Sequence, residues 1–99
     1  MYYAYILLSS KSHRCYFGSA NDLKTRFTLH NAGQVKSTKF GIPWKLIWYG
    51  GFATEKEARD FEQYLKSGSG KSFAYKRLIP VALANDFLAG RKGSPKRNA

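Results

Sequence analysis

The sequence predicts a small α+β domain, on the evidence of its residue patterning and its length. Three segments are rich in aromatic and branched residues and are typical of strands: residues 2–8, 15–19 and 44–52. Two other segments, residues 23–31 and 54–67, carry apolar side chains at helical spacing. The 99 residues suffice for one compact domain with a modest core.

The first two predicted strands are joined by a short polar stretch, so we expect them to form a hairpin. Side chains alternate along a strand, which places Tyr3 and Tyr5 on one face of the first strand. The same alternation places Tyr16 and Gly18 on one face of the second strand. The third strand contains Gly50-Gly51, where we expect a bulge.

Both predicted helices have recognisable start signals. Asn21 and Asp22 are N-cap candidates for the first helix, which Gly33 is expected to end. Thr54 followed by Glu57 forms the capping-box pattern at the start of the second helix. These signals fix the expected helix boundaries.

The C-terminal part of the chain contains a further helical pattern and a basic tail. Residues 72–79 predict a third helix, and residues 80–88 a short continuation that Pro80 is expected to break. Residues 90–99 are basic and contain Gly, Pro and Ser, which predicts disorder. The folded domain is therefore expected over residues 1–89.

The charge balance indicates a polyanionic partner. Seventeen Lys and Arg against six Asp and Glu give a formal net charge of +11. Each phosphate that a Lys or Arg neutralises releases condensed counterions, so nucleic acid is the simplest partner for such an excess. A basic domain without a specific ligand, or a ribosome-associated one, is the alternative. The patterning does not indicate an oligomeric state.

The sequence also bears on location and on other ligand classes. The single cysteine, Cys15, rules out an internal disulfide and fits a cytoplasmic protein. No window approaches a membrane span, so we expect no membrane partner. Gly68-Ser69-Gly70-Lys71-Ser72 ends like a phosphate-binding P-loop, but Leu65 stands where that loop needs its first glycine. We therefore expect no nucleotide cofactor, and expect these glycines to end the second helix.

Two polar side chains lie beside the apolar stripe of the first helix. Leu23, Phe27 and His30 follow the spacing of one helix face. Arg26 flanks this face, so an Arg and a His point towards the apolar side. A histidine there is more often a buried, hydrogen-bonded residue than a catalytic one.

In the second helix, Glu62 falls on the apolar stripe of Ala58, Phe61 and Leu65. Ionised carboxylates are rarely buried without a partner, a metal or a shifted pKa. One interpretation is an internal ion pair between Glu62 and Arg26. The other is a metal-binding carboxylate that faces a phosphate-binding arginine.

With these residues in view, the sequence resembles the GIY-YIG nuclease domain, in particular its short single-domain bacterial members. The resemblance covers roughly residues 2–78. It is carried by the segments Tyr3-Ala4-Tyr5, Tyr16-Phe17-Gly18, residues 21–31, Pro43-Trp44-Lys45-Leu46 and residues 58–66. In residues 21–31 an Arg and a His stand four apart, and residues 58–66 resemble the helix that supplies the family's metal-binding Glu.

The resemblance implies a small three-stranded antiparallel sheet flanked by helices, and metal-assisted phosphodiester hydrolysis with one Mg²⁺ or Mn²⁺ ion. It implies that Glu62 binds the metal and that Arg26 stabilises charge on the scissile phosphate. Tyr5 or Tyr16 would activate or orient the attacking water, and His30 would assist proton transfer or substrate positioning. A tyrosine could act as a base only if nearby cations lowered its pKa.

The predicted function is thus a metal-dependent endonuclease that acts on DNA, or on RNA, in nucleic-acid repair or processing. DNA is the favoured substrate. The alternative is a non-catalytic nucleic-acid-binding module on the same fold, for which Glu62 would have little use. The candidate phosphate contacts are Lys36, Lys39, Lys66 and Lys71.

Overall fold

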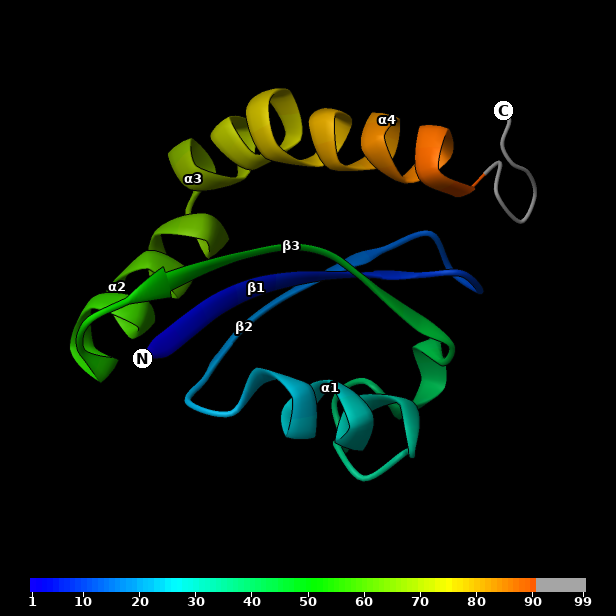
Figure 1. Ribbon diagram of the computed structural model, residues 1–99, viewed down its shortest axis with the longest axis horizontal. Coiled ribbons are helices and arrows are strands. Elements are labelled where there is room, and N and C mark those ends of the chain that lie inside the picture. The colour runs from blue at the N-terminus through cyan, green and yellow to red at the C-terminus, as the bar shows by residue number, and fades with distance from the viewer. Residues whose placement is uncertain (91–99) are drawn as a thin grey trace.

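The computed structural model describes the backbone of residues 1–90 and the side chains of residues 1–84. Its centre is an antiparallel sheet of three strands in the order β2-β1-β3 (Figure 1). The strands are β1 (Tyr2–Ser9), β2 (Cys15–Ala20) and β3 (Trp44–Phe52). The predicted α+β class is therefore confirmed, as is the β1–β2 hairpin. Both β2 and β3 are edge strands, and the free edge of β2 positions the site described below.

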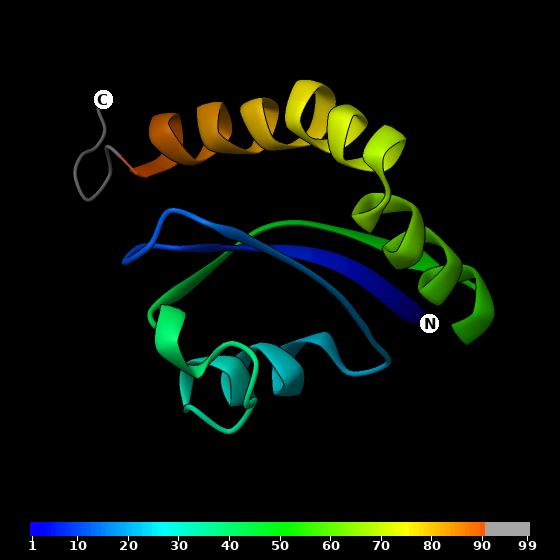
Figure 2. The same ribbon diagram turned by 180° about the vertical axis from the view of Figure 1, so that it is seen from behind.

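Helices cover both faces of the sheet (Figures 1 and 2). α1 (Leu23–Asn31) lies on one face, and α2 (Glu55–Lys66), α3 (Gly68–Phe73) and α4 (Ile79–Gly90) follow one another along the other. Each face has its own core, because alternate residues of β1 point in opposite directions. Tyr5 and Leu7 belong to the α1 side, whereas Ile6 packs with Phe17 and Leu65 on the α2 side.

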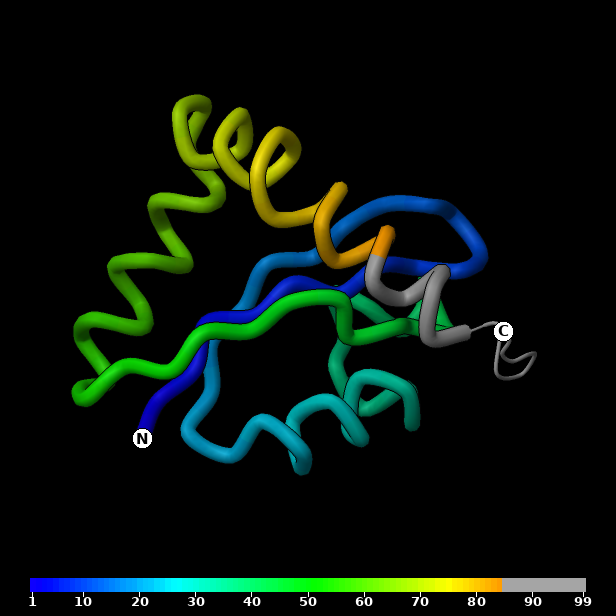
Figure 3. Tube along the Cα trace, turned by 45° about the horizontal axis from the view of Figure 1, so that its top comes forward, coloured from blue at the N-terminus to red at the C-terminus, as the bar shows by residue number. Residues whose placement is uncertain are grey.

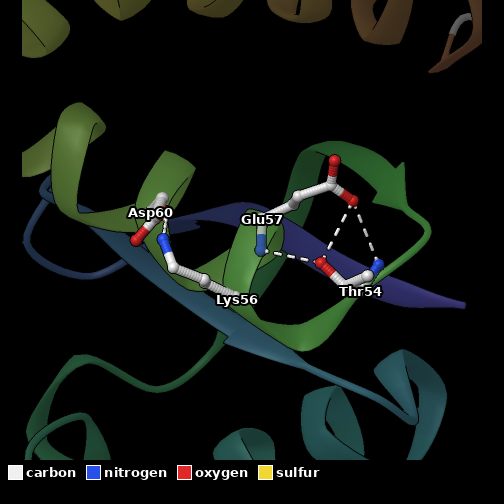
Figure 4. A network of polar contacts seen from close by, with 4 residues as sticks. All are labelled: Thr54, Lys56, Glu57 and Asp60. Atoms are coloured by element: carbon white, nitrogen blue, oxygen red, sulfur yellow. Dashed lines mark hydrogen bonds and ion pairs between the residues drawn. The ribbon is translucent and has the colours of Figure 1, made fainter.

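The predicted helix starts are confirmed. The Asp22 carboxylate accepts a hydrogen bond from the Thr25 backbone N–H at 3.1 Å and caps α1. Thr54 and Glu57 form both hydrogen bonds of the capping box at the start of α2 (Figure 4). On the exposed side of α2, Lys56 pairs with Asp60 at 2.7 Å. The other side of α2, with the buried Ala58 and Leu65, faces the sheet.

The bulge is not at Gly50-Gly51, as the sequence suggested. Those residues pair regularly with Ala4 and Tyr3, and the register shifts instead where Ile6 pairs with Trp48 and Leu7 with Leu46. Gly50 has a packing role, since a Cβ there would lie 2.8 Å from the Trp48 ring. The glycine therefore makes room for an aromatic side chain and does not interrupt the ladder.

The expectations for the C-terminal helices were wrong in two respects. α2 ends at Lys66, close to its predicted end, but the next helix, α3, begins at Gly68 and not at residue 72, because the Ser67 hydroxyl accepts the Gly70 N–H at 3.1 Å. Pro80 does not break the continuation, and the helical path runs on through a π turn over Ala74–Leu78 into α4 (Figure 3). In that wide turn the Ile79 N–H bonds the Ala74 carbonyl, which gives the proline ring room against the preceding turn.

Gly90 is the last residue of α4, and the rest of the predicted tail lies outside the described residues. Among residues 1–90, no helix has the length and apolar character needed to cross a membrane.

Candidate active site

The free edge of β2 is where polar residues from both helical layers meet. α1 follows β2 directly in the chain, and α2 packs across β2 and β1 on the other face. A cavity of about 380 Å³ opens at this edge. Its lining includes Ser19 and Ala20 of β2, Arg26 of α1, and Ala58 and Arg59 of α2. We call this cavity the β2-edge cleft.

The tyrosines of the two sequence motifs lie side by side on the α1 face of the sheet. Tyr5 pairs with Gly18 across β1 and β2, and the ring centroids of Tyr5 and Tyr16 are 6.3 Å apart. Gly18 provides the space for this arrangement. A Cβ at Gly18 would lie 2.6 Å from the Tyr5 hydroxyl oxygen and 2.9 Å from the Tyr16 ring.

Tyr5 and His30 belong to a buried chain of hydrogen bonds. The Tyr5 hydroxyl lies 2.8 Å from His30 Nε2, and His30 Nδ1 lies 2.8 Å from the Thr38 hydroxyl. That hydroxyl in turn donates to the Val35 carbonyl at 3.3 Å. Because a carbonyl oxygen can only accept a hydrogen bond, each group in the chain must donate towards Val35. His30 therefore donates from Nδ1 to Thr38 and accepts at Nε2 from Tyr5.

The pKa values of this pair agree with that assignment. Burial, reinforced by the charge of Arg26, lowers the pKa of His30 to about 4, so the ring is neutral at neutral pH. Burial is also the main reason that the pKa of Tyr5 rises to about 12, and the neighbouring Tyr16 and Glu62 add to the rise. Arg26 opposes it through its charge and a hydrogen bond, but does not outweigh it. Tyr5 thus stays protonated and lacks the lowered pKa that a catalytic base would need.

Tyr16 differs from Tyr5 in its access to solvent. It is half-buried, and its ring packs edge-on against His30 with the centroids 5.0 Å apart. Tyr5, in contrast, is 1 % exposed. Within residues 1–84 the Tyr16 hydroxyl has no hydrogen-bond partner, so it can bond a water or a substrate oxygen.

Glu62 reaches the same region from the opposite face of the sheet. Its Oε1 accepts a hydrogen bond from the Ser19 hydroxyl at 2.7 Å, and its Oε2 pairs with Lys66 at 2.6 Å. The side chain is only 14 % exposed, as its place on the buried stripe predicts. In the described part of the chain no ion pair joins Glu62 to Arg26, so the internal-pair interpretation lacks its partner. The charge of Glu62 also acts on Tyr5, where it is the smallest of the contributions to the shifted pKa.

Comparison with known proteins identifies the family to which this arrangement belongs. A family model described as the GIY-YIG catalytic domain matches residues 1–76. The chain belongs to the GIY-YIG family. The resemblance seen in the sequence is thereby confirmed.

Short bacterial proteins are similar to this GIY-YIG chain. A UPF0213 protein of Streptococcus pneumoniae serotype 4 is 37 % identical over 65 residues, which are 65 % of either chain. The UPF0213 protein YazA of Bacillus subtilis is 36 % identical over 63 residues, 63 % of this chain and 64 % of YazA. A UPF0213 protein of Bacillus licheniformis is 35 % identical over 72 residues, 72 % of this chain and 73 % of that protein. The match to the first two relatives thus spans just under two thirds of their length.

The side chains at the β2 edge suit one hard divalent cation. Among the described residues there is no group of three or more His, Cys, Asp or Glu side chains that could cage a metal. Mg²⁺ does not require such a cage, because it is often held by one or two carboxylates, several waters and substrate phosphates. Glu62 supplies such a carboxylate, and each of its oxygens keeps a lone pair beyond the bonds to Ser19 and Lys66. The residues present therefore fit a Mg²⁺ ion that is held mainly by water and phosphate.

The four predicted phosphate-contacting lysines do not form one row. Lys66 belongs to the site itself through its pair with Glu62. Lys39 lies in the short 3₁₀ helix Lys39–Gly41, with its ammonium 5.1 Å from the centre of the Phe40 ring. Lys36, in the loop before it, and Lys71, on α3, are both exposed. Their contact with phosphates stays a prediction.

Three residues that the sequence patterns did not single out contribute to the site. Ser19 holds Glu62, Thr38 holds His30, and Arg59 lines the cleft beside Arg26. Ser19 follows the Tyr16-Phe17-Gly18 motif directly. Strand alternation places it on the face opposite Gly18, and this could have predicted that Ser19 lies on the same side of the sheet as the second helix. Thr38 lies in an irregular loop, where no periodicity marks it.

Proposed function

We propose that this protein is a metal-dependent endonuclease that hydrolyses phosphodiester bonds in nucleic acid, with DNA favoured over RNA, in repair or processing. The observation that carries the proposal is that Arg26 lines an open cleft at the β2 edge together with Ser19, whose hydroxyl holds the Glu62 carboxylate at 2.7 Å, while Tyr16 lies on the same strand as Ser19. Membership of a nuclease-type family and the net charge of +11 support it. A carboxylate and an arginine placed at the same sheet edge suit phosphodiester chemistry better than they suit simple binding.

In the proposed reaction, each residue acts on a defined part of the substrate. Arg26 pairs with the non-bridging oxygens of the scissile phosphate and stabilises the charge that builds up on them. The Tyr16 hydroxyl orients the attacking water by hydrogen bonding. The water oxygen bonds to phosphorus while the bond from phosphorus to the leaving sugar oxygen breaks. The water loses one proton to solvent and the leaving oxygen gains one, so that one water is consumed per bond.

Glu62 would hold the metal ion, and Ser19 fixes the orientation of its carboxylate. When bound, a divalent ion supplies Lewis-acid stabilisation of the phosphate and lowers the pKa of a bound water. Arg59 lines the same cleft but is paired with Glu55, another lining residue, at 2.8 Å, so Arg26 is the arginine proposed to hold the phosphate.

Tyr5 and His30 have a different role in this proposal from the one that the resemblance implied. Both are buried, and His30 has both ring nitrogens in hydrogen bonds. We therefore assign them as positioning residues: His30 holds the Tyr5 hydroxyl, and Tyr5 in turn lies beside Arg26, whose charge acts on its pKa. This arrangement orients the guanidinium without proton transfer to the substrate.

One observation favours the alternative of a non-catalytic binding module. Lys66 already neutralises Glu62 at 2.6 Å, so the carboxylate has a cationic partner without a metal. In a binding module this pair would only stabilise α2.

The two functions are separated by a cleavage assay. Labelled single-stranded, duplex and branched DNA and RNA are incubated with the protein in Mg²⁺, in Mn²⁺ or in chelator. We expect metal-dependent cleavage that Glu62→Gln abolishes and Asp60→Asn, on the exposed side of the same helix, leaves intact. Binding without cleavage of any substrate in either metal would establish the binding module instead.

A further inference from the structure

A second concavity lies on the α1 face of the sheet, separate from the β2-edge cleft. Its volume is about 310 Å³, and we call it the aromatic groove. The groove is lined by Leu23, Lys24 and Phe27 of α1, Tyr3 of β1, and Leu46 and Tyr49 of β3. Lys24 is its one charged lining residue.

Two tyrosines form a wall of this groove that the core does not require. The rings of Tyr3 and Tyr49 meet edge to face, with centroids 5.9 Å apart and planes at 69°. Phe27, Leu23 and Leu46 pack against the buried residues below, whereas Tyr3 and Tyr49 are not part of that cluster. Tyr49 is 57 % exposed. A large aromatic side chain left in solvent beside a groove is available to a ligand.

The aromatic groove and the β2-edge cleft are lined by residues that are near neighbours in the chain, on β1 and on α1. Tyr2 lines the cleft and its neighbour Tyr3 lines the groove, because successive strand residues point to opposite faces. Likewise Arg26 lines the cleft and Lys24 lines the groove, on opposite sides of the same helix. A strand whose phosphate lies at Arg26 can therefore pass over the start of α1 and bring a neighbouring nucleotide to the groove.

We propose that the aromatic groove binds an unpaired base of the nucleic-acid substrate by stacking on Tyr49 and Tyr3. The inference rests on the proposed function and specifies its substrate class. Every base has a π face, so aromatic side chains beside basic residues are suited to single strands. Lys24 and the net charge of +11 complement the phosphates that accompany such a base and would not favour a neutral apolar ligand.

The consequence concerns the form of the substrate. A base that stacks in the groove cannot at the same time be paired and stacked within a duplex. Unpaired nucleotides must therefore lie beside the phosphate in the cleft, as in a single strand, an overhang or a branch point. A continuous blunt duplex would leave the groove empty.

The test measures binding in chelator, so that it does not depend on cleavage. Fluorescence anisotropy gives the affinity for a labelled single-stranded DNA, for the same strand made abasic throughout, and for a blunt duplex. Tyr49→Ala is compared with wild type, with Tyr49→Phe and with Tyr75→Ala. Tyr75 is a matched control because it is 51 % exposed and lies in the π turn on the opposite face of the sheet.

We expect Tyr49→Ala to weaken binding of the normal single strand by about ten-fold, within the range of base-aromatic stacking. Binding of the abasic strand and of the duplex should not change. The slope of log affinity against log salt should also stay the same, because no phosphate contact is lost. Tyr49→Phe should bind like wild type.

An equal loss on the abasic strand, an equal loss for Tyr75→Ala, or no loss at all would overturn the proposal. The variant should fold, because the side chain is more than half exposed, and a thermal melt checks this. Absence of cleavage would contradict the proposed endonuclease activity but not the proposed binding of a base in the aromatic groove. Failure of the stacking test would count against the groove alone.

Discussion

Replacing Thr38 by Val tests whether the buried hydrogen-bond chain fixes the state of His30. Valine nearly matches threonine in shape but removes the hydroxyl that lies 2.8 Å from His30 Nδ1. Thr38 is 1 % exposed and His30 is 0 % exposed, so water does not replace the lost partner. A buried donor without a partner costs about 1–3 kcal/mol of unfolding free energy. At about 4–8 °C per kcal/mol for a domain of this size, a loss of about 2 kcal/mol lowers the melting temperature by roughly 8–16 °C.

The substitution should also change the tautomer of His30. In the wild type, the Thr38 hydroxyl accepts a hydrogen bond from His30 Nδ1–H, and the Tyr5 hydroxyl donates to His30 Nε2. Without the Thr38 hydroxyl, a proton on Nδ1 has no acceptor, whereas a proton on Nε2 can be donated to the Tyr5 oxygen. The Tyr5 hydroxyl then loses its acceptor at His30, and because the Arg26 guanidinium cannot accept a hydrogen bond, the O–H must reorient beside the group that is proposed to hold the phosphate.

Calorimetry and nitrogen NMR of the imidazole ring measure these two effects separately. Thr38→Ser is the control, because it keeps the hydroxyl and should keep the wild-type tautomer with a smaller loss of stability. A merely structural role for Thr38 would lower the melting temperature but leave the tautomer unchanged. An unchanged melting temperature and tautomer in Thr38→Val would refute the proton order assigned to the chain.

Four further predictions concern the site and the substrate. Glu62→Gln should abolish cleavage, because an amide is a poor ligand for Mg²⁺. It should leave nucleic-acid affinity equal or higher, because the substitution removes a negative charge from the site. A variant that melts early and still cuts would contradict the metal-ligand assignment. The pKa of His30 is about 4 in the folded protein and about 6.5 in the unfolded chain, so the unfolded chain binds the proton first as the pH falls. The free energy of unfolding should therefore decrease as the pH drops from 6.5 to 4, and an NMR titration midpoint of His30 near 6.5 would contradict this. Gly18→Ala should lower the unfolding free energy by about 1–3 kcal/mol through overpacking against the tyrosines, and a urea midpoint equal to that of wild type would contradict it. Lys36→Gln should reduce the log–log salt slope of binding by about one unit if this lysine contacts a phosphate, and an unchanged slope would show that it does not.

Local patterns predicted the elements of this protein well, because the forces that make them act over a few residues. The hairpin follows from two branched and aromatic runs with a polar turn between them, and the capping box of Thr54 and Glu57 is a contact across three residues. Glu62 on the buried stripe follows from helical periodicity alone. The errors in helix boundaries came from a competing local signal. Ser67 caps a new helix in a glycine-containing segment that was not expected to be helical, and a π turn accommodates Pro80.

The tertiary structure decided which residues touch and in what protonation state. Ser19 meets Glu62 from 43 residues away, and Tyr5 meets His30 from 25 residues away. Helices on opposite faces of the sheet bring Arg26 and Arg59 to one cleft only because β2 is an edge strand. Such contacts depend on the path of the whole chain, so no local period encodes them.

The amino-acid sequence alone was enough to predict the family, the three strands, the first two helices and the residue types available for chemistry. Tyr5 and Tyr16 were equivalent candidates at that level, since both occupy motif positions on neighbouring strands. Only the folded chain distinguishes them: Tyr5 is buried against His30 with its pKa raised to about 12, while Tyr16 stays within reach of solvent. The physical reason is desolvation. The free energy of a charged group depends on everything packed around it, and that packing exists only in the tertiary structure.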